Sequence, residues 1–433
     1  MLILVGSLMP FDPPLCGTRR RIAVIGAGIS GLGAARALAS NHEVTIFEAR
    51  NRLGGHACTV MAGSTRDVPT DMGFIVYNDK NYPNLRLLFE ELNTPTKPSN
   101  MSFSASFDGG NYEYGLRLGA LFSQKQNLIR PSFYKMVQDI LKFNKRAHLA
   151  LDRSDLTLDE FLNEIGTSTI FRERYLLPFA GAIWSASPAE ILEFPAATLC
   201  RFFQNHGLLA SSGQPEWRTV DGGSQVYVCQ LEGLIKKQGV TIRKNAKIES
   251  VKGGSSPTVK PIGLPSEEFD AVILSCHSDQ ALKLIVDAPL KLTSALADIH
   301  YSANTVVMHN DHRFMPKRKS CWSSWNYLGK LGKDPKKIGV TYWMNNLQDL
   351  PTSEDIFVTL NPDRTIEDSN VFACTEFSHP QFDQGAILAQ NTLKNMQGDG
   401  GLWFAGAYHR YGFHEDGLLS GLEAAKSVVA ALA

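Results

Sequence analysis

The sequence predicts an α/β fold that combines a domain built on a parallel sheet with a second, mixed α+β lobe. Residues 21–25 and 42–47 are short apolar runs typical of buried strands. Between them, residues 32–40 are rich in alanine and leucine, as expected of a helix. This strand–helix–strand order predicts a parallel sheet at the N-terminus. The α/β character returns after residue 220, which predicts that distant parts of the chain build the same domain.

The later elements of this domain are read from the same signals. Residues 227–238 are expected to form a helix, and 241–243, 248–251 and 271–275 to form strands. The Gly-, Pro- and Ser-rich stretch 253–266 is expected to be a loop or a hairpin tip. Residues 402–406 predict one more strand, and residues 417–431 a closing helix.

The second lobe differs in composition from the first. Residues 96–214 are expected to be mostly helical, with helices over 131–151, 157–165 and 171–183. Residues 286–394 carry β-branched runs at 305–307, 340–343 and 357–360, which predict antiparallel strands. We therefore predict a disordered leader over 1–18 and a discontinuous domain made of 19–95, 215–285 and 395–433.

Charge and cysteine usage limit the class of protein. The 433-residue chain has 43 basic and 43 acidic residues, which gives no reason to expect nucleic acid as a partner. Its seven cysteines are scattered and form no CxxC pair, so we expect no metal site and a reducing, cytoplasmic setting. No apolar run reaches the roughly 20 residues that span a bilayer.

A glycine fingerprint follows the first strand. Gly26-Ala27-Gly28-Ile29-Ser30-Gly31 reads GxGxxG and opens the first helix. In such a loop the first glycine makes the turn, the second lets a pyrophosphate approach, and the third packs helix on strand. The helix N-terminus favours phosphate, and Glu48, at the end of the second strand, is placed to accept ribose hydroxyls. These features predict dinucleotide binding.

The residues after the second strand distinguish between dinucleotides. The stretch from Glu48 to His56 reads ExxxRxGGH and resembles the flavin-containing amine oxidoreductase superfamily. The resemblance implies a Rossmann-type FAD-binding domain of the amine oxidase and glutathione reductase kind. It also implies that Arg52 reaches the pyrophosphate, and that the neighbouring cofactor contacts come from Ala49, Arg50, Gly54, Gly55 and His56.

Further stretches carry the same resemblance. The residues around Asp71 look like the superfamily's turn near the isoalloxazine ring, and 243–248 look like the turn that meets the adenine. Residues 404–406 and 416–421 look like the ribityl turn and the start of the final helix. The resemblance thus adds as FAD contacts Met72, Gly73, Phe74, Ile75, Lys247, Ile248, Gly406, Ala407, His414, Glu415, Asp416 and Gly417.

Three positions depart from the amine oxidase pattern. Ala407 and Tyr408 stand where a carboxylate usually serves the ribityl hydroxyls, and Asn304 stands near the position of a lysine that reaches flavin N5 through water. His414 replaces an aromatic residue of the amine cage, which binds its substrate through ring faces. These changes weaken the expectation of an amine substrate.

A narrower resemblance extends over most of the chain. Residues 73–78, 81–85, 182–185, 205–209, 217–224, 323–327 and 412–417 resemble a branch of FAD-binding proteins encoded beside cyclopropane-fatty-acid-synthase-type methyltransferases. Some of its members are similar to methyl-branched fatty acyl desaturases. The resemblance implies a fatty acyl or phospholipid substrate, a lipid methyltransferase as partner, and a peripheral contact with the inner membrane face.

Four side chains are candidates for acid–base work on such a substrate. His414 is first, because its match faces the flavin and an imidazole titrates near neutrality. Glu415, Tyr77 and His206 follow, although Glu415 could equally complement the final helix. We expect an FAD-dependent desaturase. An amine or amino-acid oxidase, a double-bond isomerase and a non-catalytic partner of the methyltransferase remain alternatives.

Overall fold

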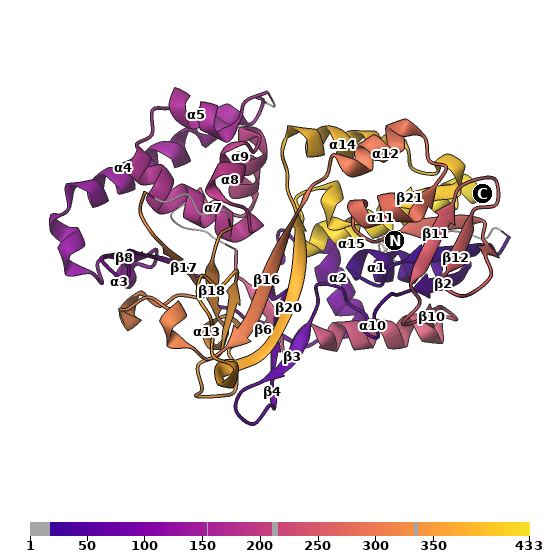
Figure 1. Ribbon diagram of the computed structural model, residues 1–433, viewed down its shortest axis with the longest axis horizontal. Helices are drawn as coiled ribbons and strands as arrows, with labels where there is room; N and C mark the ends of the chain where they lie inside the picture. Colours follow the sequence, from indigo (N-terminus) through magenta and orange to yellow (C-terminus); the bar gives the residue numbers. More distant parts are fainter. Residues whose placement is uncertain (1–17, 154, 210–214, 333–336) are drawn as a thin grey trace, which may run out of the picture.

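The computed structural model describes residues 18–153, 155–209, 215–332 and 337–433. A helical lobe, a large β-sheet and an α/β domain follow one another along the long axis of the molecule (Figure 1). The expected leader over 1–18 lies outside the described residues except for Thr18. The α/β fold predicted from the sequence is confirmed.

A five-stranded parallel sheet forms the centre of the α/β domain. Its order is β10-β2-β1-β14-β21, so strands from both ends of the chain lie side by side. All were expected: β1 (Arg21–Ile25), β2 (Glu43–Phe47), β10 (Thr241–Arg243), β14 (Ala271–Leu274) and β21 (Leu402–Phe404). Because parallel strands pair in register, the C-terminal ends of β1, β2 and β14 meet at one edge.

The two faces of this sheet bury different cores. On one face, Val24 and Ile273 pack under four helices: α1 (Ile29–Leu38), α2 (Pro83–Leu92), α10 (Gln225–Lys237) and α15 (His414–Leu432). On the other face, Ala23 and Leu274 pack under α11 (Ser278–Leu284), α12 (Leu290–Ala297) and α14 (Gln384–Asn395). Alternate residues of one strand thus serve opposite cores, which explains why these strands read as continuous apolar runs.

A four-stranded sheet, β13-β12-β11-β15, also lies on the second face. The strand β11 (Ile248–Lys252) pairs antiparallel with β12 (Thr258–Pro261). The stretch 253–266 is therefore a hairpin whose return strand is longer than expected. Because prolines and glycines flank β12, its β-branched residues did not stand out as a strand in the sequence. The remaining strands of this sheet are β13 (Glu267–Glu268) and β15 (Ile285–Val286).

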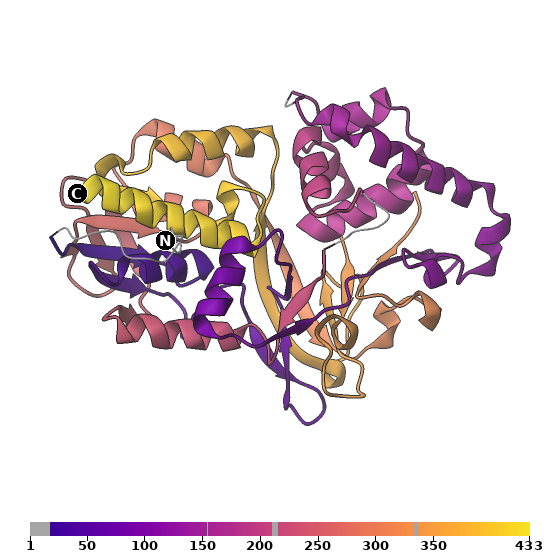
Figure 2. The ribbon, with the colours of Figure 1, turned by 180° about the vertical axis from the view of Figure 1, so that it is seen from behind.

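Helix α15 packs tightly against α1, as Figure 2 shows from behind. A Cβ at Gly421 would lie 2.1 Å from the Ser30 carbonyl oxygen, so only glycine permits this approach. The helix begins at His414, three residues before the expected start at 417. The Asp416 carboxylate accepts the backbone N–H of Phe413 and stabilises this additional turn.

A seven-stranded sheet lies between the α/β domain and the helical lobe (Figure 1). Most of its strands come from 286–394, as expected: β16 (Tyr301–His309), β17 (Trp325–Gly329), β18 (Val340–Trp343), β19 (Phe357–Leu360) and β20 (Val371–Pro380). The segment 96–214, expected to be mostly helical, begins with strands. There β7 (Phe103–Phe107) and β8 (Tyr112–Gly115) complete this sheet, with β7 parallel to β17.

The helical lobe contains the three expected helices with altered bounds. The helix expected over 131–151 is α4 (Pro131–Arg146), that over 157–165 is α5 (Leu158–Glu164), and that over 171–183 is divided into α6 (Thr169–Phe171) and α7 (Leu177–Trp184). The lobe also has α3 (Leu118–Leu121), α8 (Pro188–Leu192) and α9 (Ala196–Asn205), which were not predicted individually. Aromatic side chains such as Phe143, Phe161 and Phe203 fill its core. Smaller sheets pair β3 (Thr59–Ala62) with β4 (Val68–Asp71), and β9 (Arg218–Val220) with β5 (Val76–Tyr77) and β6 (Thr96–Pro98). No helix in the described ranges combines the length and apolar character needed to cross a bilayer.

Candidate active site

The glycine fingerprint forms the turn between β1 and α1. Gly26 has a φ of 104°, a conformation that disfavours other residues. A Cβ at Gly31 would lie 2.0 Å from the Gly26 carbonyl oxygen, so the third glycine lets the helix close onto the turn. A Cβ at Gly28 would meet no atom within 4 Å. Gly28 therefore faces open space at the N-terminus of α1, where the helix dipole attracts a phosphate group.

Glu48 braces this loop from the end of β2. Its two carboxylate oxygens accept the backbone N–H groups of Ala27 and Arg50, each at 2.8 Å. The carbonyl of Ala27 in turn accepts the N–H of Gly54 at 2.8 Å. The expected contact of Glu48 with a ribose stays a prediction, but the carboxylate is held at the correct edge of the sheet.

Arg52 orders the second glycine segment. Its guanidinium donates to the carbonyls of Gly55 at 2.9 Å and Ala57 at 3.1 Å. Gly54 bridges directly to Gly28, so the Gly54–Gly55 segment runs beside the phosphate loop, as the sequence motif predicts. A direct contact of Arg52 with the pyrophosphate stays a prediction.

A surface pocket of about 500 Å³ lies at the expected adenine end. Ala49 and Lys247 line it, together with Pro261 and Ile262 from the β12 hairpin. The backbone N–H of Asn245 donates to the Arg50 carbonyl at 3.0 Å, which joins the turn before β11 to the end of β2. Ile248 begins β11 directly behind this turn.

The segment expected near the isoalloxazine ring packs against the start of α15. The Phe74 N–H donates to the His56 carbonyl at 2.9 Å, which places Gly73 beside the Gly54–Gly55 segment. The Phe74 ring stacks on His414, with centroids 4.0 Å apart and planes 11° apart. Met72 and Ile75, on either side, are buried in the core below the large sheet. The phosphate-loop residues and the final helix thus enclose one site.

The remaining predicted contacts lie where α1 and α15 meet. The Gly406 N–H donates to the Ser420 hydroxyl at 2.8 Å, and Ala407 lies near Gly417. Gly417 itself packs on Ile29.

These features fit the FAD that the sequence predicts. The open space at Gly28, the ordered Gly54–Gly55 segment and the pocket beside Ala49 form a path along the ends of β1 and β2. The N-terminus of α15 closes the far end of this path, where its dipole would stabilise negative charge on a reduced flavin.

His414 is a neutral imidazole held in one orientation. Its Nε2 lies 2.6 Å from the Tyr227 hydroxyl, on the face of the molecule covered by α10. Burial lowers the pKa of His414 to about 3 and raises the pKa of Tyr227 well above its usual value. Tyr227 therefore keeps its proton at neutral pH, and His414 stays uncharged. Sequence reasoning missed Tyr227, since no motif links two residues 187 positions apart.

Glu415 and Asp416 are engaged within the protein. Glu415 accepts the backbone N–H groups of Asn84 and Leu85, each at 3.0 Å, and so caps the N-terminus of α2. Asp416 accepts the N–H groups of Phe413 at 3.0 Å and Tyr411 at 3.2 Å. Burial raises the pKa of Asp416 to about 6. Both carboxylates thus hold the start of α15, and catalysis by Glu415 stays a prediction.

The other two catalytic candidates lie apart from His414. His206 ends α9, where its ring stacks on Phe202 at 3.8 Å and its Nδ1 lies 2.9 Å from the Phe202 carbonyl oxygen. Burial lowers its pKa to about 4. Phe202 stacks on Phe413, so His206 reaches the site through aromatic contacts. Tyr77 is buried and packs edge-on against Phe89.

Three histidines form a cluster that sequence reasoning missed as a unit. His56 lies 5.9 Å from His277 and 5.5 Å from His379, between ring centroids, and stacks on Phe377 at 4.6 Å. Burial is the main cause that lowers all three pKa values, that of His379 to about 4. The sequence did contain a signal for His277, which follows β14 at the edge where parallel sheets place their ligands.

Two polar residues near the cluster are also fixed. Asn304 donates from Nδ2 to His379 Nδ1 at 3.3 Å, and its Oδ1 accepts from Asn361 at 2.7 Å. Asp71 accepts from Ser224, Thr59 and Gln348, while burial raises its pKa to about 6. Asp71 thus ties β4 to the N-terminus of α10.

Comparisons with known proteins agree with this geometry. The family model of flavin containing amine oxidoreductases matches residues 29–346. Polyamine oxidase 4 of Oryza sativa subsp. japonica is 24% identical over 355 residues, which cover 78% of this chain and 67% of that protein. A protein described as flavin-containing monoamine oxidase AofH, from Mycobacterium tuberculosis, is 42% identical over 79 residues, only 16% of its length.

Solved structures resemble the whole chain at low identity. The CLA-producing fatty acid isomerase from P. acnes is 15% identical, with a TM-score of 0.67 over 95% of this chain and 99% of that one. Cyclohexylamine oxidase from Brevibacterium oxydans IH-35A is 14% identical, with a TM-score of 0.67 over 96% and 99%. These similarities confirm the fold. The chain belongs to the flavin-containing amine oxidoreductase family, and with it to the FAD-dependent oxidoreductases.

Proposed function

We propose that this FAD-dependent oxidoreductase desaturates a methyl-branched or unsaturated fatty acyl chain of a membrane phospholipid. Sequence resemblance to the methyl-branched acyl desaturase branch supports the substrate class. The fold shared with a fatty acid isomerase supports an acyl chain as substrate. A methyl-branched substrate would be the product of a lipid methyltransferase, the partner that the same resemblance suggests.

The observation that carries the proposal is that the acidic side chains described around the start of α15 already have hydrogen-bond partners within the protein. The carboxylates of Asp71, Glu415 and Asp416 accept hydrogen bonds from groups within the protein. Burial keeps His414 and His379 neutral at pH 7, with pKa values of about 3 and 4. Such surroundings would stabilise a substrate ammonium only weakly. An apolar acyl chain has no charge that must be compensated when it leaves water for this site.

Aromatic rings extend this neutral surface toward the helical lobe. Phe413 stacks on Phe202 at 4.8 Å, and Trp184 lies 4.7 Å from Phe202, between ring centroids. Together with His206 they connect the start of α15 to the core of the helical lobe. In this proposal the aromatic cluster offers an acyl chain apolar contact.

Desaturation removes a hydride and a proton from neighbouring carbons. A bound FAD supplies the hydride acceptor. The protein must then position the chain and let the proton leave. A pKa of about 3 makes His414 a weak base at neutral pH. We therefore assign it the role of an uncharged side chain that lines the site and is oriented by Tyr227. The proton passes to water in this scheme.

Anaerobic reduction of the bound flavin tests the proposal. The purified holoenzyme is mixed with a methyl-branched phospholipid, and in parallel with a panel of amines, and the visible flavin absorbance is followed. We expect the lipid alone to bleach the flavin. Bleaching by an amine and not by the lipid would contradict the proposal and identify an amine oxidase.

The fatty acid isomerase suggests a second candidate function. An isomerase would return the hydride to the same chain, so it would shift a double bond without lasting bleaching. Product analysis of the same lipid distinguishes the two: desaturation lowers its mass by two hydrogens, and isomerisation leaves its mass unchanged.

A further inference from the structure

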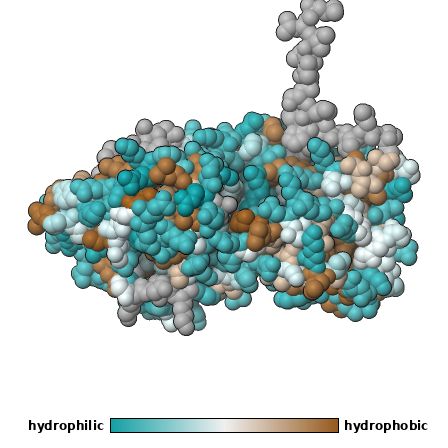
Figure 3. Space-filling model, turned by 90° about the horizontal axis from the view of Figure 1, so that it is seen from above, coloured by the Kyte–Doolittle hydropathy of each residue, from teal (hydrophilic) through white to brown (hydrophobic). Residues whose placement is uncertain are grey.

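The tip of the helical lobe exposes apolar side chains to solvent. Four of them form what we term the tip patch: Phe122, Leu128, Ile129 and Tyr134, with exposed fractions of 39%, 49%, 82% and 45%. The Tyr134 hydroxyl donates to the Leu128 carbonyl at 2.8 Å, and Phe122 contacts Phe133, the residue before Tyr134. Hydrophobic side chains gather at this end of the molecule in the space-filling view (Figure 3).

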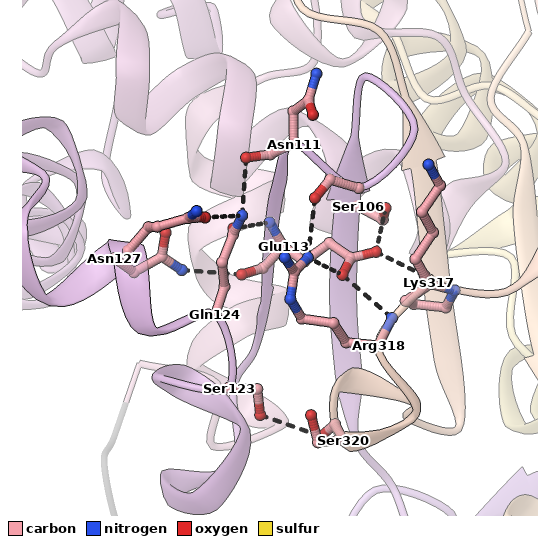
Figure 4. A network of polar contacts seen from close by, with 12 residues as sticks. Ser106, Asn111, Glu113, Ser123, Gln124, Asn127, Lys317, Arg318 and Ser320 are labelled. Carbon is pink, nitrogen blue, oxygen red and sulfur yellow. Dashed lines mark hydrogen bonds and ion pairs between the residues drawn. The ribbon is translucent and has the colours of Figure 1, made fainter.

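A buried polar network supports the tip patch from below (Figure 4). The Gln124 and Asn127 side chains are buried, and they bind the backbone N–H and carbonyl of Glu113 at 2.7 and 2.9 Å. The Glu113 carboxylate, also buried, accepts from Arg318 at 2.7 Å. The short helix η1 (Lys125–Ile129) is therefore fixed to β8. This contact holds the exposed side chains of Leu128 and Ile129 at the surface.

The segment that carries the patch is rich in basic residues. Residues 116–146 contain seven basic residues and one acidic residue, Asp139, in a chain whose total charges balance. Asp139 is buried and pairs with Lys135 at 2.9 Å, so it offsets that one cation. The even charge of the whole sequence concealed this local excess. The basic residues are Arg117, Lys125, Arg130, Lys135, Lys142, Lys145 and Arg146.

We propose that the tip patch docks the protein on an anionic lipid bilayer, with Ile129 and Leu128 inserted between headgroups and the surrounding cations on the lipid phosphates. Aliphatic side chains flanked by lysine and arginine are the composition of interfacial membrane contacts. Nucleic acid would also attract the cations, but Ile129, the most exposed member of the patch at 82%, is aliphatic and offers a base no ring on which to stack. The docking rests on the proposed function only in that a membrane phospholipid is the substrate.

Vesicle flotation with the holoenzyme tests the docking without turnover. The vesicles are phosphatidylcholine with and without phosphatidylglycerol. We expect binding to the anionic vesicles, reduced at about 1 M salt, where the screening length falls to about 3 Å. Ile129→Ser should weaken this binding about tenfold, and Lys125→Glu by a similar factor on anionic vesicles alone.

Two matched variants serve as controls. Leu290→Ser changes another highly exposed leucine, 81% exposed on α12, and Lys237→Glu changes an exposed lysine on α10. Both should bind vesicles as the unaltered protein does. Equal weakening by Leu290→Ser, or full binding by Ile129→Ser, would overturn the proposal.

Other occupants give different results. Binding of a labelled oligonucleotide that Lys125→Glu abolishes, without vesicle binding, would assign the patch to nucleic acid. Self-association in sedimentation velocity that Ile129→Ser abolishes, again without vesicle binding, would assign it to a second copy. Either result overturns the membrane proposal. Flavin bleaching by a dispersed acyl substrate is scored separately, so a failure of docking and a failure of the proposed reaction remain distinct.

Discussion

The α/β domain and the helical lobe both use polar side chains to fix backbone segments, but with different results. In the α/β domain, the partly buried Glu48 and Arg52 bind backbone groups and shape loops beside the open space at Gly28. At the tip of the helical lobe, the buried Glu113 and Gln124 bind backbone groups and fix a surface segment. The first arrangement borders open space that a ligand can enter, and the second supports the exposed tip patch. A fixed charge alone therefore does not mark a ligand site, and open space beside it does.

The largest expected effect comes from closing the space in the α/β domain. Gly31→Val places a side chain against the Gly26 carbonyl oxygen, which a Cβ alone would approach to 2.0 Å. We expect loss of bound FAD, measured as flavin absorbance per protein, together with a lower thermal midpoint. Gly233→Ala is the control, because a Cβ there meets no atom within 4 Å. Retained FAD in Gly31→Val would break the assignment of the phosphate loop.

A smaller effect is expected in the aromatic surface between the lobes. Phe202→Leu removes the stacking on Phe413 and His206. We expect kcat/KM for the acyl substrate to fall roughly tenfold with FAD retained, about the loss of one aromatic contact. Phe143→Leu changes a phenylalanine in the same core without contacting Phe413. If both variants lose equal activity, Phe202 acts through stability and not through the substrate.

We expect Glu415, which lies at the start of α15 and caps α2, to have a structural role. Glu415→Gln keeps the size of the side chain but removes one acceptor from the cap of α2. We expect a loss of about 1–2 kcal/mol in the free energy of unfolding and unchanged turnover in FAD-saturated protein. Glu423→Gln, on the exposed face of α15, should change neither quantity. A large loss of turnover at full FAD occupancy would make Glu415 catalytic.

The smallest effect concerns the pH dependence of stability. The pKa of His414 is about 3 in the folded protein and near 6.5 in the unfolded chain, so the unfolded state takes up the proton first. His414 therefore stabilises the fold above pH 6.5, and this contribution is lost as the pH falls toward 3. His414→Phe should make the fall in unfolding free energy between pH 7.5 and 5 shallower, by at most one proton. Urea unfolding at several pH values measures the slope, and an unchanged slope would show that His414 is solvated.

The sequence predicted features that depend on local geometry. Gly26, Gly28 and Gly31 follow from the backbone conformation of one turn, and the strands of the parallel sheet follow from their apolar runs. The contact between Tyr227 and His414 joins residues distant in sequence, so no spacing could predict it. The strand β7 was missed for a related reason, since its partner β17 lies more than 200 residues away. The strand β8 pairs with β7 itself.

The same distinction between local features and tertiary contacts applies to the candidate site. Glu48 directly follows β2 and Gly54 bridges to Gly28, because a motif encodes a local loop, and the contacts of these residues with FAD stay predictions. The neutral state of His414 depends on burial by segments that meet only in the folded protein, and an imidazole in a sequence carries no sign of its pKa. The capping role of Glu415 depends on the position of α2, another tertiary contact.

The most direct test of the central claim is a single anaerobic turnover in which reduced flavin and lipid product are counted together. The holoenzyme is mixed with methyl-branched phospholipid, the loss of visible absorbance gives the reduced flavin, and mass spectrometry gives the lipid lighter by two hydrogens. We predict one such lipid for each flavin reduced. Flavin that stays oxidised beside unchanged lipid, while an amine reduces it, would contradict the account.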